Sequence, residues 1–171
     1  MFGALLPERF VKSAYKVDYD DLYRRGYRGL IFDIDNTLVP HDAPATARAA
    51  MLVRKLKKRG FCVEIVSNNE EPRVKSFAEG VGCDYVYKAG KPKSGGYLEA
   101  VRKMGLRREA VMVIGDQLFT DIWGANRSRM HNILVGRISF REPPHIHLKR
   151  ILEYPLLLAF FAREKKRGKS F

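Results

Sequence analysis

Four groups of side chains that carry oxygen or nitrogen each follow an apolar run in this 171-residue chain. The groups are Asp33-Ile34-Asp35-Asn36-Thr37, Ser67-Asn68-Asn69, Lys88-Ala89-Gly90-Lys91-Pro92 and Gly115-Asp116, with Asp121 five positions after Asp116. Each group alone is a weak signal, because acid pairs, polar turns and helix caps are common in loops that do no chemistry. If the groups meet at one place, three crowded carboxylates repel one another unless a cation joins them. Oxygen ligands favour Mg²⁺ over zinc, and a nearby lysine completes the parts that phosphoryl transfer requires.

The apolar runs before these groups predict buried parallel strands. The expected strands are residues 29–32, 61–66, 85–87 and 110–114, with a fifth at an edge, residues 132–135. Segments of helical period lie between them, at residues 47–59, 72–80, 96–104 and 118–128. This alternation predicts the α/β class: a doubly wound, mostly parallel, five-stranded Rossmann-like sheet with helices on both faces. Ligands bind such sheets beyond the carboxyl ends of the strands, where all four polar groups fall.

The composition is that of one folded domain over residues 1–171. With 46% hydrophobic residues, the chain can form a core, and wholesale disorder is not expected. No apolar run approaches the roughly 20 residues that cross a bilayer, and the first residues do not form an ordinary secretory signal. Cys62 and Cys83 lie in stretches that we expect to be at least partly buried, and they form no C-x-x-C pair. These features suit a reducing cytosol, so we expect a cytoplasmic protein.

The formal net charge of +13 predicts attraction to an anionic partner. Nucleic acid, an acidic protein and an anionic membrane all fit, and solubility through net charge is the plain alternative. The two ends of the chain, residues 1–25 and 145–171, are candidates for membrane association. In the second, an apolar run at residues 151–162 is followed by a basic run at residues 163–167, and such a pair can lie in the interface of an anionic bilayer. The alternative is a terminal helix that covers the sheet, followed by a solvated basic tail.

Taken together, the four groups resemble the motifs of the haloacid dehalogenase-like (HAD) phosphohydrolases in order and setting. The resemblance spans about residues 29 to 132 and rests on DIDNT, Ser67, Lys91-Pro92 and GDQLFTD. The third motif is the loosest, since Lys88 or Lys93 could take the place of Lys91. The alternative for the whole set is an inactive relative that uses the fold for binding.

The resemblance implies roles for the residues that match these motifs. Asp33 attacks phosphorus and becomes an aspartyl-phosphate. Asp35 protonates the leaving oxygen and then deprotonates the water that hydrolyses the intermediate. Ser67 and Lys91 complete the catalytic set by binding the phosphoryl oxygens. The implied substrate-binding residues are Thr37, which also shapes the loop after the nucleophile, Asn68 and Lys91.

The resemblance also implies that Mg²⁺ is the cofactor. Asp33, Asp116 and the backbone carbonyl of Asp35 would hold it, and Asp121 would support it directly or through water. Four aspartates, Asp33, Asp35, Asp116 and Asp121, therefore make up the expected metal site.

Neither of the two places where many relatives carry a cap domain, after the first and after the third strand, has room for one. Only residues 38–44 separate the first motif from the next helix, so the site should be open, which suits a phosphate presented on something large. The stretches LLPERFVKS, DIDNTLV, SNN and GDQLFTDIWGAN resemble the capless YqeG-type subgroup (subfamily IIIA), which is similar to mitochondrial phosphatidylglycerophosphate phosphatases. The implied function is dephosphorylation of phosphatidylglycerophosphate to phosphatidylglycerol, by a protein bound peripherally to the inner face of the membrane.

Two alternatives to the lipid substrate stay open. One is a phosphatase for a soluble or protein phosphomonoester. The other is a basic RNA- or ribosome-binding protein whose phosphatase site is secondary. Nucleic acid is the less favoured partner, because the chain contains no recognisable RNA-reading motif. The oligomeric state is left open.

Overall fold

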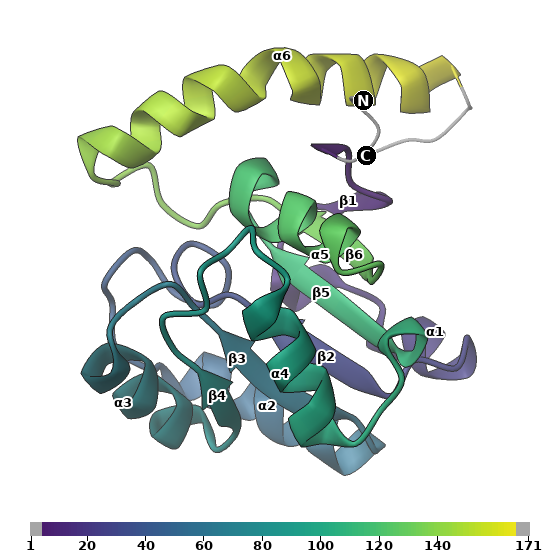
Figure 1. Ribbon diagram of the computed structural model, residues 1–171, viewed down its shortest axis with the longest axis vertical. Coiled ribbons are helices and arrows are strands. Elements are labelled where there is room, and N and C mark those ends of the chain that lie inside the picture. The colour runs from purple at the N-terminus through teal and green to yellow at the C-terminus, as the bar shows by residue number, and fades with distance from the viewer. Residues whose placement is uncertain (1–4, 167–171) are drawn as a thin grey trace.

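Six parallel strands form the central sheet of the computed structural model, which describes residues 5–166. In sheet order they are β1 (Arg9–Val11), β6 (His131–Val135), β5 (Val111–Gly115), β2 (Gly29–Phe32), β3 (Cys62–Val66) and β4 (Asp84–Val86). The ends of the two terminal segments singled out above, residues 1–4 and 167–171, lie outside the described residues. Because all pairings are parallel, the carboxyl ends of the strands meet at one edge of the sheet (Figure 1).

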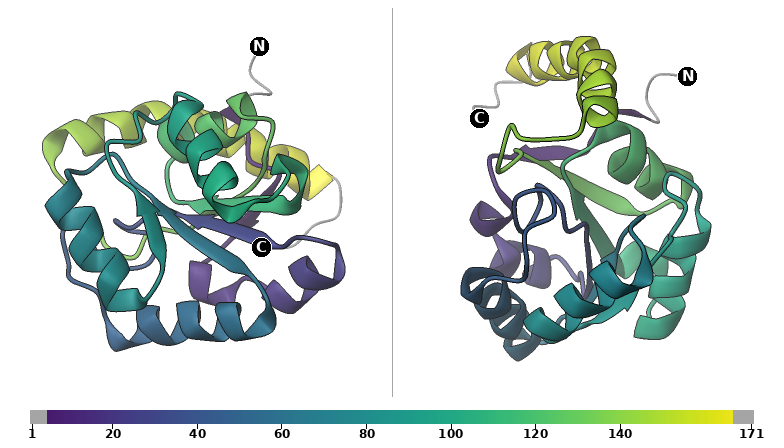
Figure 2. Two further views of the ribbon diagram at one scale, coloured as in Figure 1. Left: turned by 60° about the horizontal axis from the view of Figure 1, so that its bottom comes forward. Right: turned by 90° about the vertical axis from the view of Figure 1, so that its left-hand side faces the viewer.

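Helices cover both faces of the sheet, as the doubly wound prediction required (Figures 1 and 2). One face carries α1 (Tyr19–Arg24), α2 (Ala47–Arg59) and α3 (Glu71–Val81), and the other carries α4 (Gly95–Met104) and α5 (Trp123–Arg127). The long α6 (Pro144–Lys166) crosses one end of the molecule, against a π-helical turn, η4 (Leu118–Ile122). Two short 3₁₀ turns, η2 (Ala14–Lys16) and η3 (Arg108–Ala110), complete the described elements.

The predicted strand count was wrong by one. Strand β1 pairs in parallel with β6, with Phe10 opposite Leu134, so β6 is not an edge strand. Three residues that include a charged arginine are too short for a recognisable period, which is why the sequence did not reveal β1. The same N-terminal region continues into the core, where Ala14 and Leu22 are fully buried.

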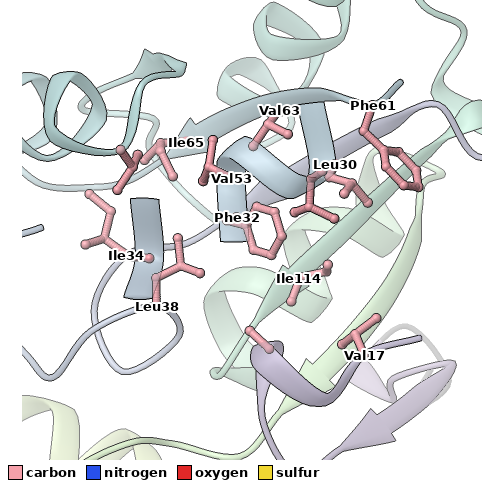
Figure 3. Packing of buried hydrophobic residues seen from close by; sticks show 14 of the residues in the cluster. Val17, Leu30, Phe32, Ile34, Leu38, Val53, Phe61, Val63, Ile65 and Ile114 are labelled. Carbon is pink, nitrogen blue, oxygen red and sulfur yellow. The ribbon is translucent and has the colours of Figure 1, made fainter. Parts of the chain in front are cut away.

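The main core lies between β2, β3, β5 and the helices α2 and α3 (Figure 3). Leu30 and Phe32 of β2 pack there with Val53 of α2, and all three are fully buried. Burying one such side chain contributes about 1.5–3 kcal/mol relative to leaving it exposed. The predicted bounds of α2 are confirmed: the hydroxyl of Thr46 caps its first turn, and Gly60, at φ 105°, ends it in a backbone region that glycine tolerates.

The connections between elements are short, and no inserted domain covers the sheet edge in the described part of the chain. Residues 33–46 join β2 to α2, and residues 87–94 join β4 to α4. Within residues 5–166, no helix combines the length and apolar character needed to cross a membrane. Cys62 is exposed, contrary to expectation, because it stands at the first position of β3, before the strand enters the core; Cys83 is half-buried as expected.

Candidate active site

The four polar groups do converge at the carboxyl edge of the sheet. Asp33 follows β2 directly, and its N–H donates to the carbonyl of Ile114 on β5 at 3.1 Å, so the ladder holds the first residue of the group. Ser67 follows β3 and is held in the same way by Val86 of β4 at 3.0 Å. The central strands therefore fix the backbone at Asp33 and Ser67.

Lys91 is the basic centre of the site. Its Nζ lies 2.6 Å from Asp33 Oδ1 and 2.7 Å from Asp121 Oδ1, and its side chain is only 4% exposed. The amide side chain of Asn68 fixes the Lys91 backbone, accepting from its N–H at 2.7 Å and donating to its carbonyl at 3.2 Å. The other two candidate lysines are exposed; Lys88 pairs with Glu70 at the surface. Of the three, the structure brings Lys91 to the carboxylates.

Asp33, Asp116 and Asp121 form a group in which one oxygen of each lies within 4.8 Å of the others. The hydroxyl of Thr37 donates to Asp116 Oδ1 at 3.2 Å, and the N–H of Gln117 donates to Asp121 Oδ2 at 3.2 Å. These contacts leave further lone pairs on each carboxylate. Three buried carboxylates with oxygen-only donors fit a hard divalent cation such as Mg²⁺.

Close backbone approach is needed to assemble this group. A Cβ at Gly115 would collide with the side chain of Asp121, so only glycine lets the end of β5 pass so near that carboxylate. Without this glycine, Asp121 would be displaced from Asp33 and Lys91.

The side chain of Asp35 lies outside that group. It accepts hydrogen bonds from the Asn69 amide at 2.6 Å, from the N–H of Asp42 at 2.8 Å and from the Arg73 guanidinium at 3.2 Å. The metal contact expected through the Asp35 backbone carbonyl stays a prediction. The three contacts fix the Asp35 carboxyl beside the nucleophile candidate Asp33, where a proton donor and acceptor would be required.

Burial is the largest cause of the pKa shifts of Asp33 and Asp116 in the acidic group. Burial raises the pKa of Asp33 to about 7, although Lys91 opposes this, and burial raises the pKa of Asp116 to about 8, although Arg150 opposes it. Burial alone would lower the pKa of Lys91, but Asp121 and Asp33 raise it well above its usual value. Within the described residues, Lys91 and Arg150 are the cations that contact the three carboxylates. A divalent cation bound there would favour the ionised carboxylates and so oppose the effect of burial.

A pocket of about 160 Å³ opens in front of these groups. Asp33, Asp35, Ser67, Asn68 and Lys91 line it from the sheet, and Ile146 and Lys149 of α6 line it from the other side, with His41, Asn69, Gln117 and Thr120 completing the wall. A larger pocket of about 440 Å³ lies elsewhere, between α1 and α2, and contains none of these residues. The small pocket is large enough for a phosphoryl group and too small for a whole lipid.

Arg150 of α6 is a site residue that sequence reasoning missed. Its Nη1 donates to the Asp116 carbonyl at 2.6 Å, and its Nη2 contacts Asp116 Oδ2. The guanidinium also bonds the buried side chain of Glu142 at 2.8 Å, and Glu142 in turn accepts from Asn36 at 2.7 Å. Arg150 therefore ties α6, the end of β5 and the loop after β2 into one network.

No local pattern could have indicated these partners. Arg150 lies in a helix without a motif, 34 positions after Asp116. Asn69 belongs to the second polar group, but nothing in that group indicates that it binds Asp35. Arg73, which also holds Asp35, differs in no local way from a solvated residue at the start of a helix. Only the tertiary arrangement brings them to the site.

Comparison with known proteins agrees with this geometry. A family model described as haloacid dehalogenase-like hydrolase matches residues 42–129. Probable phosphatase YqeG of Bacillus subtilis (strain 168) is 47% identical over 155 residues, which are 90% of this chain and 90% of that protein. Phosphatidylglycerophosphate phosphatase 1, chloroplastic/mitochondrial, of Arabidopsis thaliana is 27% identical over 90% of this chain, which corresponds to 47% of that longer protein.

Solved structures show the same fold at low identity. An uncharacterized protein from Listeria monocytogenes serotype 4b superposes with a TM-score of 0.53 at 16% identity, over 68% of this chain and 85% of that one. A hypothetical protein from Xanthomonas campestris gives 0.52 at 17% identity, over 80% and 78%. With the family match over half of its residues and a relative at 47% identity over most of its length, the chain belongs to the haloacid dehalogenase-like hydrolase family.

Proposed function

We propose that this protein is a Mg²⁺-dependent phosphatase that works through a covalent phospho-aspartate at Asp33 and acts on phosphatidylglycerophosphate presented by a membrane. The phosphatase assignment itself follows from the family and from the relative at 47% identity. The observation that carries the chemistry is Lys91, which contacts both Asp33 and Asp121 from within the buried acidic group.

The residues account for both halves of the reaction. A carboxylate oxygen of Asp33 attacks phosphorus, the ester P–O bond breaks, and Asp35 gives its proton to the leaving oxygen. Water then attacks the phosphorus of the aspartyl-phosphate, Asp35 takes a proton from that water, and the bond between Asp33 and phosphorus breaks to release inorganic phosphate. Ser67 and Lys91 hold the phosphoryl oxygens in both steps.

Positive charge around the phosphoryl group is the main requirement of this chemistry. Mg²⁺ held by Asp33, Asp116 and Asp121, with the Asp35 carbonyl, would neutralise charge that develops on the phosphoryl oxygens. Lys91 supplies a fixed cation at the same place and offsets the charge of Asp33, so that an anionic phosphate can approach it. Thr37 and Arg150 keep the Asp116 carboxylate oriented.

Three observations support a lipid substrate. The described residues include no cap, so nothing encloses a small metabolite, and the pocket of about 160 Å³ fits only the phosphorylated end of a larger molecule. A relative named phosphatidylglycerophosphate phosphatase 1 matches 90% of this chain. A membrane substrate also accounts for the net charge of +13, because anionic lipids attract a basic protein. We propose accordingly that the protein acts as a peripheral protein on the cytoplasmic face of a membrane.

The test is Mg²⁺-dependent phosphate release from phosphatidylglycerophosphate in mixed micelles, beside a panel of soluble phosphomonoesters, with Asp33→Asn as the blank. We expect strong preference for the lipid and no turnover in the variant. Turnover of soluble esters alone would retain Asp33 as the nucleophile and overturn the lipid substrate. Absence of turnover with every substrate would overturn the phosphatase chemistry and favour a binding protein.

A further inference from the structure

Helix α6 turns its acidic residues inward. Glu153 and Glu164, the two acids of the helix, are 1% and 4% exposed, and Glu153 accepts a hydrogen bond from the N–H of Phe119 at 3.0 Å. Ile146, Arg150 and Phe160 share this inner face, and Arg150 reaches Asp116 from it. The side of α6 that packs on the protein is therefore rich in buried charge.

The opposite side of α6 is apolar and faces away from the protein (Figures 1 and 2). We call Leu148, Ile151, Leu152, Tyr154 and Leu158 the outer face of α6. Each of these side chains is between 53% and 68% exposed. Phe140, in the loop before the helix, adds a side chain that is 72% exposed. A surface helix ordinarily places polar residues outside, whereas α6 is apolar on its outer face as well as at Leu156 and Leu157, which pack against the protein.

The exposed charged residues of α6 indicate what kind of partner its outer face would bind. Every charged residue of α6 that is fully exposed within the described part of the chain is basic, namely Lys149, Arg163, Lys165 and Lys166. A second copy docked through the same face would bring like charges together, which is unfavourable. RNA would match the charge and leave the apolar side chains unburied. An anionic bilayer accepts both, since apolar side chains enter its interface while lysine and arginine stay among the head groups.

We propose that the outer face of α6, with Phe140, docks in the interface of an anionic bilayer with the helix lying along the membrane surface. The inner face stays packed on η4 and β6, so the helix offers only one side to lipid. After docking, the phosphate pocket would lie on the inner side of the same helix, because Ile146 and Lys149 of α6 line that pocket. The surface deepens the proposed function and rests on it only for the identity of the lipid substrate.

The test measures partitioning of the full chain into vesicles, without substrate, by flotation. The vesicles are phosphatidylcholine alone and phosphatidylcholine mixed with phosphatidylglycerol. The double variant Ile151→Ser/Leu152→Ser should bind the anionic vesicles at least about tenfold more weakly than wild type. Lys165→Gln/Lys166→Gln should lose about fivefold per lysine, and added salt should weaken wild-type binding. The matched control is Met51→Ser/Leu98→Ser, which removes exposed apolar side chains from α2 and α4 and should leave binding unchanged.

Failure of this proposal can be told apart from failure of the proposed function. Equal vesicle binding by wild type and Ile151→Ser/Leu152→Ser, or no binding by wild type, would overturn the docking surface. A dimer that the same double variant dissociates would assign the face to a second copy and would also overturn it. Turnover of lipid in micelles despite either result would leave the proposed function standing. Vesicle binding that depends on the outer face, without hydrolysis of any lipid phosphate, would support the surface and reject the substrate.

Discussion

Two buried acidic regions of this protein differ in how many partners contact their carboxyl groups. The first region lies at the carboxyl edge of the sheet and consists of Asp33, Asp116 and Asp121. Lys91 and Arg150, which belong to other parts of the chain, contact these residues. Glu64 lies in the middle of β3, 3% exposed, and its Oε2 has no hydrogen-bond partner within residues 5–166. Convergence of partners from several elements distinguishes the first region as a site. In the second region, a buried carboxyl oxygen without a hydrogen-bond partner lowers the stability of the folded state.

The largest effect should follow from Asp33→Asn. The amide keeps the size of the carboxyl group and cannot act as the nucleophile, so turnover should fall at least about 10⁴-fold. Removing one of three crowded carboxylates should leave the melting temperature of the metal-free protein equal or higher. Steady-state phosphate release and thermal unfolding measure the two effects. Turnover within tenfold of wild type would remove Asp33 from the mechanism.

Lys91→Met should cost both activity and stability. The side chain is buried between two carboxylates, and breaking a buried ion pair by removing one partner costs about 3–5 kcal/mol. We expect turnover to fall at least about 10³-fold and the urea midpoint to drop. The matched control is Lys88→Met, which removes an exposed lysine that pairs with Glu70 and should change neither quantity. Equal effects of the two variants would return the choice among the candidate lysines to Lys88 or Lys93.

Arg150→Gln should weaken metal binding and also lower the free energy of unfolding, because Asp116 and Glu142 lose their cation. Arg150 orients Asp116 through its carbonyl and its carboxylate, and loss of a contact that orients a metal ligand lowers affinity about 10–100-fold. Titration with Mn²⁺, followed by the electron paramagnetic resonance of the free ion, measures this independently of turnover. Arg163→Gln, on the exposed side of the same helix, is the control. Tighter Mn²⁺ binding by Arg150→Gln would show instead that the guanidinium competes with the metal for Asp116.

Glu64→Gln should produce the smallest effect, and the effect should grow as pH rises from about 4.5 to about 7. Burial raises the pKa of Glu64 from 4.5 to about 7. Between these values the folded state binds more protons than the unfolded state, so the free energy of unfolding falls as pH rises through this window. We expect the variant to match wild type at about pH 5 and to exceed it by about 1–2 kcal/mol at about pH 8, measured by urea unfolding. A parallel pH dependence in wild type and variant would contradict the account of this region.

The contrast between the regions also explains which parts of the fold and of the site could be predicted from the sequence. The strands could be predicted because parallel, buried strands produce continuous apolar runs, as in Gly29–Phe32. The acidic group and Lys91 could be placed because each follows such a run, and the carboxyl ends of parallel strands share an edge. Each of these groups can be recognised from its own short stretch of sequence, although the groups are far apart along the chain.

The remaining parts depend on tertiary contacts. Strand β1 is recognisable only through its pairing with β6, since three residues have no period of their own. The contact of Arg150 with Asp116 depends on where α6 crosses the molecule. The exposure of the apolar side of α6 follows from the same placement, because a helical period does not reveal which face turns outward.

The central claim is the covalent phospho-aspartate at Asp33, and rapid acid quench with phosphate-labelled substrate tests it most directly. The account predicts label on the peptide that contains Asp33 during the first turnover, released by hydroxylamine and absent from Asp33→Asn. In Asp35→Asn, which lacks the acid of the first step and the base of the second, the label should form more slowly and, once formed, be lost more slowly. Stoichiometric release of the alcohol in the first turnover, with the Asp33 peptide unlabelled in both wild type and Asp35→Asn, would contradict the account.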